Sequence, residues 1–92
     1  MYTENMAEAG STTYAILESI CDWWGNHRFG PTMDEINIDV GLSGPSAVHF
    51  HLKKLEADGL IARIPRKHRS IRCTHKGARL VELMREFEKE DQ

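Results

Sequence analysis

The spacing of apolar residues predicts an amphipathic helix near the start of the chain. Residues three and four positions apart share one face of a helix. The apolar residues at this spacing are Ile16, Leu17, Ile20, Cys21 and Trp24. The hydroxyl residues 11–13 are suited to cap the N-terminus of this helix, and Gly25 with the polar residues after it ends the helix. Residues 1–10 are polar without a sustained period, which predicts a flexible tail.

Two further helices are predicted close together, joined by a tight turn. Thr32 and Glu35 have the spacing of a capping box, in which each side chain bonds the other residue's amide. Gly41 ends the helix that they begin, because glycine takes a positive φ without steric cost. Pro45 then stands in the first turn of a helix over 44–58, where a missing amide costs nothing. Two short helices joined by a turn with glycine are typical of a helix-turn-helix.

The helix over 44–58 has two different faces. Val48, Leu52 and Leu55 are four and three positions apart and form one apolar stripe toward the core. At about 100° per residue, the opposite face carries Ser46, His49, Phe50 and Lys53. An aromatic side chain on the face away from the core indicates a binding partner.

The last third of the chain predicts a β-hairpin and a final helix. Alternating residues predict strands over 60–64 and 70–74, with a basic turn over 65–69. The helix over 77–92 has an apolar stripe of Leu80, Leu83, Met84 and Phe87. The predicted fold is mainly α with a small β-hairpin. It is a winged helix-turn-helix domain over 11–76, with a three-helix core, a two-stranded wing and an additional C-terminal helix.

The charge distribution changes the picture more than the net charge of −2 does. Seven cations and no acidic residue fall within 60–79: Arg63, Arg66, Lys67, Arg69, Arg72, Lys76 and Arg79. Such a block is either an ordinary solvated loop or an electrostatic footprint for phosphate. Beside a helix with an outward polar face, it favours double-stranded DNA, with the helix in the major groove and the wing on phosphates.

Residues 30–72 resemble the N-terminal DNA-binding domain of the LexA repressor family. The shared residues are Pro31, Thr32, Glu35, Ile36, Gly41, Pro45, Ala47, His51, Leu52, Lys53, Leu55, Gly59, Ile61 and Ile64, followed by the wing sequence 69–72. The resemblance implies a winged helix that binds operator DNA as a dimer and represses transcription. His49 and Phe50 stand where that family carries acidic residues, so we expect a different operator sequence.

The predicted interface combines the resemblance with the exposed helix face. The expected base contacts are Ser46, Ala47, His49, Phe50 and Lys53. The expected phosphate contacts are Ser43, Lys54, Arg63, Arg66, Lys67, Arg69 and Arg72.

The C-terminal end departs from that family. LexA repressors continue into a self-cleaving Ser/Lys protease domain that also dimerises them. This chain stops at Gln92, so we expect it not to use that switch. Residues 74–77 and the helix after them are similar to the end of a MarR-type winged helix, which implies dimerisation through the Leu80, Leu83, Met84 and Phe87 stripe. The alternative is that this stripe packs on the chain's own core.

Other chemistry finds little support in the sequence. No nucleophile elbow or phosphate-binding glycine loop is present, so we expect no enzyme activity. We expect no cofactor and no metal site, since His49 and His51 point about 200° apart on a helix. No apolar run is long enough to span a membrane, and we expect no membrane partner. Cys21 and Cys73 are expected to be free thiols of a cytoplasmic, nucleoid-associated protein.

Three alternatives stay open. Trp23 and Trp24 are able to line a pocket for a small-molecule effector, or to divide between core and interface. The outward face of the 44–58 helix suits a protein partner as well as DNA, because Phe50 is apolar and the chain outside the basic segment 60–79 has a net negative charge. A DNA-binding accessory factor for replication or excision would dock in the same way without regulating a promoter.

Overall fold

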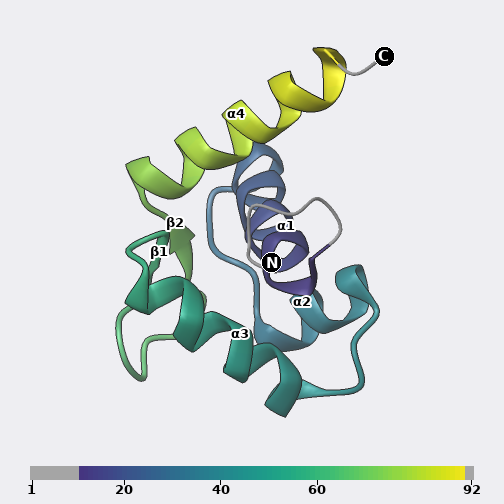
Figure 1. The fold of residues 1–92 in the computed structure, drawn as a ribbon. Coiled ribbons are helices and arrows are strands. Elements are labelled where there is room, and N and C mark those ends of the chain that lie inside the picture. Colours follow the sequence, from purple (N-terminus) through teal and green to yellow (C-terminus); the bar gives the residue numbers. More distant parts are fainter. Residues whose placement is uncertain (1–10, 91–92) are drawn as a thin grey trace.

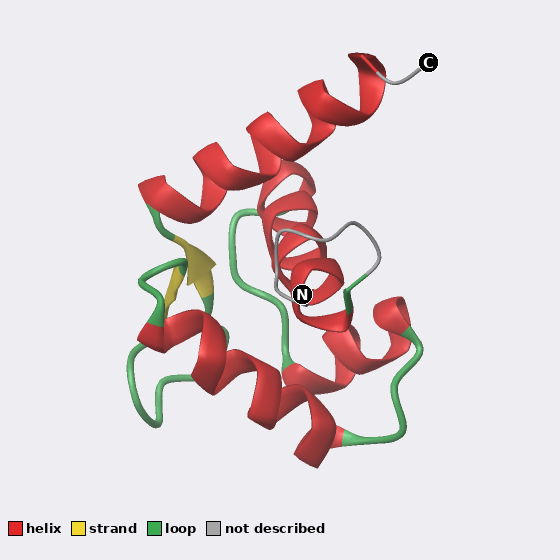
Figure 2. Ribbon diagram, viewed as in Figure 1, coloured by secondary structure: helices red, strands yellow, loops and turns green. Residues whose placement is uncertain are grey.

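The computed structural model of the chain describes residues 11–90, so the predicted tail over 1–10 lies outside the described part. The helices are α1 (Thr12–Asn26), α2 (Met33–Val40), α3 (Pro45–Ala57) and α4 (His75–Glu90). The strands β1 (Ile61–Ala62) and β2 (Arg72–Cys73) form one antiparallel pair between α3 and α4. Figures 1 and 2 show this order of helices with a single hairpin, which confirms the predicted winged helix-turn-helix.

The central helix α1 lies between α4 on one side and the α2–α3 pair on the other (Figure 1). The residues with no solvent exposure come from these helices: Ile16, Leu17, Ile20, Ile36, Val48, Leu52 and Leu55. The stripe predicted for the 44–58 helix is therefore confirmed as core. On its opposite face Ser46, His49, Phe50 and Lys53 are exposed, and the wing follows on the same side of the molecule as α3.

The helix ends are fixed by the local contacts that the sequence predicted. Ser11 Oγ accepts a hydrogen bond from the Tyr14 amide at 3.0 Å, which caps α1. The Thr32 amide donates to Glu35 Oε1 at 2.8 Å, and the Glu35 amide donates to Thr32 Oγ1 at 3.1 Å. Gly41 has a φ of 81° at the end of α2, a conformation that side chains with a Cβ resist.

The wing is shorter as a sheet than the sequence predicted. The pairs are Ile61 with Cys73 and Ala62 with Arg72, where we expected strands over 60–64 and 70–74. The ladder ends because the Ser70 side chain, and not the backbone of the opposite strand, bonds the backbone of Ile64. Ser70 Oγ accepts a hydrogen bond from the Ile64 amide at 2.9 Å and donates one to the Ile64 carbonyl at 3.1 Å.

The last helix starts two residues earlier than predicted. The Thr74 hydroxyl accepts a hydrogen bond from the Gly77 amide at 3.1 Å and thereby caps α4 at His75. His75 is thus the first residue of the helix.

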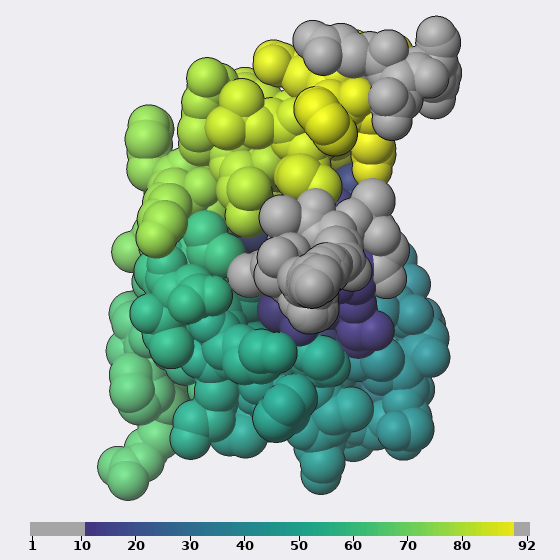
Figure 3. Space-filling model, in the orientation of Figure 1, coloured from purple at the N-terminus to yellow at the C-terminus, as the bar shows by residue number. Residues whose placement is uncertain are grey.

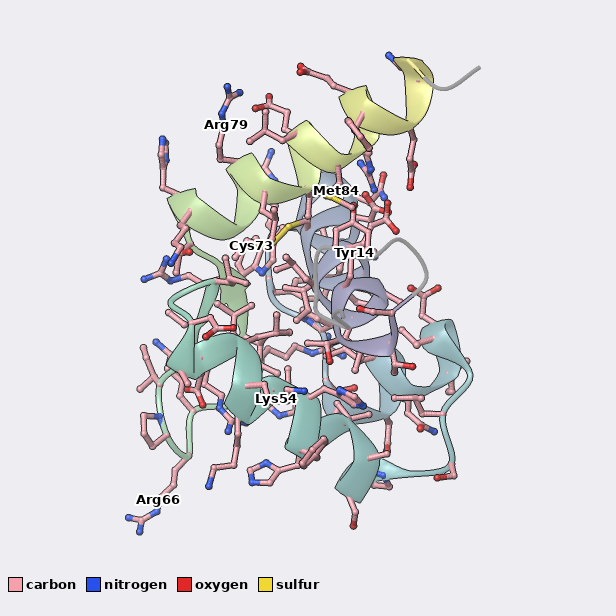
Figure 4. The ribbon with its side chains drawn as sticks, in the orientation of Figure 1. Tyr14, Lys54, Arg66, Cys73, Arg79 and Met84 are labelled. Carbon is pink, nitrogen blue, oxygen red and sulfur yellow. A yellow bond between two sulfur atoms is a disulfide. The ribbon has the colours of Figure 1, made fainter. Side chains whose placement is uncertain are left out.

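The prediction of two free thiols is wrong. Cys21 of α1 and Cys73 of β2 form a disulfide, with 5.9 Å between their Cα atoms (Figure 4). The two residues are 52 positions apart in sequence. They meet because the face of α1 near its end packs against the second strand of the wing, which the spacing along the chain does not reveal.

Candidate nucleic-acid interface

The outward face of α3 is polar except for one aromatic side chain. Pro45 occupies the first turn, as predicted. Ser46, His49 and Lys53 are exposed, while Ala47 is half-buried. Phe50 lies on the same face with 60% of its surface exposed. The structure therefore brings the five predicted base-contact residues together on one accessible helix.

The wing has an exposed tip and an anchored base. We call residues 64–68 the wing tip and residues 69–73 the wing base. Arg66 and Lys67 of the tip are exposed, and within the part of the chain that the structure describes neither forms an ion pair. The Arg66 side chain extends away from the body of the molecule (Figure 4). Both side chains are therefore accessible to a partner without the loss of an ion pair among the described residues.

The wing tip and α3 face the same side and enclose a groove between them. Figure 3 shows the wing and α3 next to each other at the edge of the molecule opposite α4. The groove has a volume of about 800 Å³ and is lined by Pro45 and His49 of α3 and by residues 63–71. Two acidic residues also line it, Asp34 at the start of α2 and Glu56 of α3.

Arg69 has contacts that differ from those of the tip residues. Its guanidinium donates to both carboxylate oxygens of Glu35, at 2.9 and 3.0 Å, and to the Gly30 carbonyl at 3.0 Å. It also lies 4.7 Å from the centre of the Phe29 ring. The hydrogen bond from Arg69, helped by the Thr32 amide, lowers the pKa of Glu35 to about 2. The guanidinium predicted to bind phosphate therefore links the wing to the N-terminus of α2.

Two of the other four predicted phosphate contacts already interact with a neighbouring side chain. Arg63 forms an ion pair with Glu56, with 3.2 Å between Nε and Oε2. Lys54 Nζ lies 5.5 Å from the centre of the Phe50 ring. Arg72 lines a separate hollow with Cys21 and Trp24, on the side of the hairpin toward α1 and α4. Ser43, in the turn before α3, is exposed.

Two anchors of the wing base were missed by the sequence reasoning. The Trp24 indole Nε1 donates to the Ile71 carbonyl at 2.7 Å. The Gly30 amide donates to the Arg69 carbonyl at 3.1 Å, and a Cβ on Gly30 would collide with the Ile71 carbonyl oxygen. A glycine between Phe29 and Pro31 and a tryptophan at the end of α1 were the only local signals, and neither identifies its partner.

His51 lies beside the core stripe of α3 and forms a hydrogen bond with α1. Its Nδ1 lies 2.7 Å from Thr13 Oγ1 of α1. Burial, and then the charge of Lys54, lower the pKa of His51. The ring thus joins α3 to α1 directly beneath the exposed face.

The two tryptophans divide between different environments. Trp24 bonds the wing base, whereas Trp23 stacks on His27 with 4.0 Å between ring centres. Trp23 lines a hollow of about 370 Å³ with Ile38 and Asp39. An effector site there stays a prediction.

The apolar stripe of α4 also divides. Leu80 and Met84 pack against the core, on either side of the buried Val81. Leu83 and Phe87 are 44% and 65% exposed. Packing on the chain's own core therefore holds for Leu80 and Met84, while dimerisation through the stripe stays a prediction.

Two further observations concern residues 11–90. No helix among them combines the length and the apolar character required to cross a membrane. No group of three or more His, Cys, Asp or Glu among these residues is arranged to hold a metal ion.

Comparisons with known proteins agree with the geometry. Residues 11–70 match the family described as LexA DNA binding domain. The chain is 42% identical over 72 residues to the LexA repressor of Lactobacillus delbrueckii subsp. bulgaricus (strain ATCC BAA-365 / Lb-18), a match that covers 78% of this chain and 35% of that protein. It is 47% identical over 62 residues to the LexA repressor of Lacticaseibacillus casei (strain BL23), covering 67% of this chain and 30% of that one.

A third relative matches over a longer stretch. The LexA repressor of Ligilactobacillus salivarius (strain UCC118) is 39% identical over 77 residues, which is 84% of this chain and 37% of the relative. The matches thus span about a third of the length of these relatives. The family match extends from the cap of α1 to the wing base, over more than half of the chain, and therefore shows that this chain belongs to the LexA DNA-binding domain family.

Proposed function

We propose that this chain binds a specific double-stranded DNA sequence and represses transcription from it. One observation carries the proposal: the free face of α3 and the basic wing tip lie on one side of a LexA-family DNA-binding domain. The relatives named LexA repressor support repression as the outcome. Binding alone blocks a promoter, so no catalytic group is required.

In this proposal α3 enters the major groove, which is about 12 Å wide and admits one helix. Ser46, Ala47, His49, Phe50 and Lys53 then meet base edges. Arg66 and Lys67 lie along the phosphates, where they displace counterions and supply affinity that falls with salt.

The remaining predicted phosphate contacts play smaller parts in this proposal. Ser43 and Lys54 approach the backbone near α3. Arg63, Arg69 and Arg72 contribute less than the tip residues, because Glu56 and Glu35 already bind the first two and Arg72 faces away from the groove.

We further propose that α4 joins two copies of the chain. Leu83 and Phe87 are exposed apolar residues four positions apart, on the helix farthest from α3. A dimer through this face leaves both α3 helices free. Sedimentation equilibrium over rising concentration tests it. We expect the wild type to be a dimer. The double variant Leu83→Glu, Phe87→Glu should be a monomer, whereas Glu82→Gln on the same helix should remain a dimer. A monomer at every concentration would overturn it.

The test of DNA binding is selection of bound sequences from a random duplex pool, followed by titration of the selected duplex at several salt concentrations. We expect a palindrome with half-sites about 34–36 Å apart, or a multiple. We expect a plot of the logarithm of the association constant against the logarithm of the salt concentration to have a negative slope of several units. Each neutralised phosphate contributes roughly 0.9 to that slope. No enriched sequence and a flat salt response would refute the proposal and favour a protein partner for α3.

A promoter assay then separates repression from an accessory role in replication or excision. The selected site is placed across a promoter, and transcription is measured with increasing amounts of the chain. The proposed place of action is the nucleoid in the cytoplasm. Because a reducing compartment favours thiols, binding is measured with and without reductant.

A further inference from the structure

Phe50 is the one large apolar side chain on the outward face of α3. It is 60% exposed, whereas the core residues of the same helix, Val48 and Leu52, have no exposure. Its neighbours on the helix surface, Ser46, Lys53 and Lys54, are polar and exposed. The ring is not part of the core, so most of its surface is in contact with water until a partner covers it.

The ring is supported from within the chain. Lys54 Nζ lies 5.5 Å from the ring centre, which is a cation–π contact. The His51 ring meets it edge-on, with 5.2 Å between centres and 80° between planes. His51 is itself fixed to Thr13 at 2.7 Å. These contacts limit the rotation of the ring and lower the entropy lost when a partner covers it.

The chemistry of the major groove restricts what such a ring can recognise. Phe50 has no hydrogen-bond donor or acceptor, so the polar edges of guanine, adenine and cytosine offer it nothing. The C5-methyl group of thymine is the apolar group that base edges present in this groove. We infer that Phe50 selects thymine at one position of each half-site by covering this methyl group. The inference rests on the proposed DNA binding and adds the base that one residue reads.

The neighbouring residues cannot replace Phe50 in this role. His49 and Lys53 carry polar groups that pair with hydrogen-bonding base edges. Ala47 is half-buried and reaches less far from the helix than a phenyl ring. The inference therefore predicts that sensitivity to a thymine methyl depends on Phe50.

Deoxyuridine provides the experiment, because it differs from thymidine only by the missing methyl group. Each thymine of the selected duplex is replaced singly by deoxyuridine, and the dissociation constant is measured by fluorescence anisotropy. We expect one position in each half-site to bind about fourfold more weakly without the methyl group, the value of one buried methyl. Cytosine and 5-methylcytosine at that position give a second comparison, in which the methylated base binds more tightly.

The variants assign the effect to the ring. We expect Phe50→Ala to bind the thymine and deoxyuridine duplexes equally, and Phe50→Leu to keep part of the difference. Since Phe50 is exposed, both variants are expected to fold, and circular dichroism checks this. Ile38→Ala is the matched control, because Ile38 is a 78% exposed apolar residue on α2. It is expected to keep the fourfold difference.

Two results would overturn the inference while leaving the proposed function intact. One is specific, salt-dependent binding in which no thymine is sensitive to its methyl group. The other is a thymine preference that Phe50→Leu and Phe50→Ala both retain in full. If Phe50→Ala binds no duplex, the Phe50→Leu comparison decides. Wild-type protein that binds no duplex would refute the proposed function itself.

Discussion

The wing base and the wing tip carry the same kind of residue in opposite settings. Arg69 and Arg66 are both arginines with a positive φ, of 57° and 63°. Arg69 is bound by Glu35 and covered by Phe29, whereas Arg66 extends into solvent. One run of basic residues thus contains side chains that hold the fold together and side chains that are free to bind. The charge of a side chain does not tell these two kinds of arginine apart. An acidic partner within the chain, such as Glu35 for Arg69, does.

The largest effect is expected at the link between the wing base and α1. Replacing both Cys21 and Cys73 by serine removes a cross-link between residues that are 52 positions apart in sequence. The free energy of unfolding should fall by about 4 kcal/mol, because the unfolded chain regains the entropy of an open loop. Urea unfolding of both proteins measures this.

Reductant supplies the control for that variant. It is expected to lower the stability of the wild type toward that of the double variant, and to leave the double variant unchanged. An equal urea midpoint for the oxidised and reduced wild type would show that the base of the wing does not depend on the cross-link.

The next effect concerns the close approach of the chain to the wing base. Gly30→Ala places a methyl group against the Ile71 carbonyl and should destabilise the fold by about 1–3 kcal/mol. Gly25→Ala is the matched control, because nothing lies near its added Cβ and alanine favours the helix. Thermal unfolding of the two variants compares them. If both variants lose stability equally, the clash at the wing base is not the cause.

A smaller effect is expected from the ion pair between Glu35 and Arg69. The pKa of Glu35 is about 2 in the fold against an ordinary 4.5, so the contribution is complete above pH 4.5 and is lost as the pH falls toward 2. Because about a third of each side chain is exposed, we expect about 1 kcal/mol after solvent screening. Urea unfolding of wild type and Glu35→Gln at pH 7 and pH 3 measures it.

The pH window identifies the group. The lowered pKa of His51 affects stability at a higher pH than Glu35 does. As the pH drops below 6.5, the His51 side chain takes up a proton in the unfolded state before it does so in the fold, so the free energy of unfolding falls. A loss that appears only in that window, and that Glu35→Gln retains in full, would assign the pH dependence to His51 and not to the ion pair.

The smallest effect on stability is expected at the tip. Arg66→Gln and Lys67→Gln should each change the free energy of unfolding by less than about 0.5 kcal/mol, because both side chains are exposed. Each should lower the salt slope of DNA binding by roughly 0.9 and weaken all sequences alike. A change in which sequence is preferred would contradict the division between wing and α3.

Local features were predictable from the sequence, and contacts between distant segments were not. The capping box of α2, the positive φ of Gly41 and the core stripe of α3 depend on residues within one turn or one helix. The disulfide and the Trp24 contact with Ile71 join segments 52 and 47 positions apart. No periodicity along the chain records such pairs.

The candidate site shows the same limit. The sequence placed Ser46, His49 and Phe50 on an outward face, and the structure exposes them all. It treated Arg66 and Arg69 as equivalent, because the acidic partner of Arg69 lies 34 positions earlier. Which cation of a basic segment is already bound is a property of the packed molecule.

Glu35 has a consequence for how this chain can change over evolutionary time. Its carboxylate accepts the Thr32 amide and binds Arg69, so losing the acid removes half of the capping box of α2 and leaves the guanidinium beside Phe29 without its anionic partner. Positions 35 and 69 are therefore expected to vary together among relatives. Ser46 and His49 are exposed and serve no such double purpose, so they can drift singly. The DNA sequence that the protein recognises can then change during evolution while the fold stays the same.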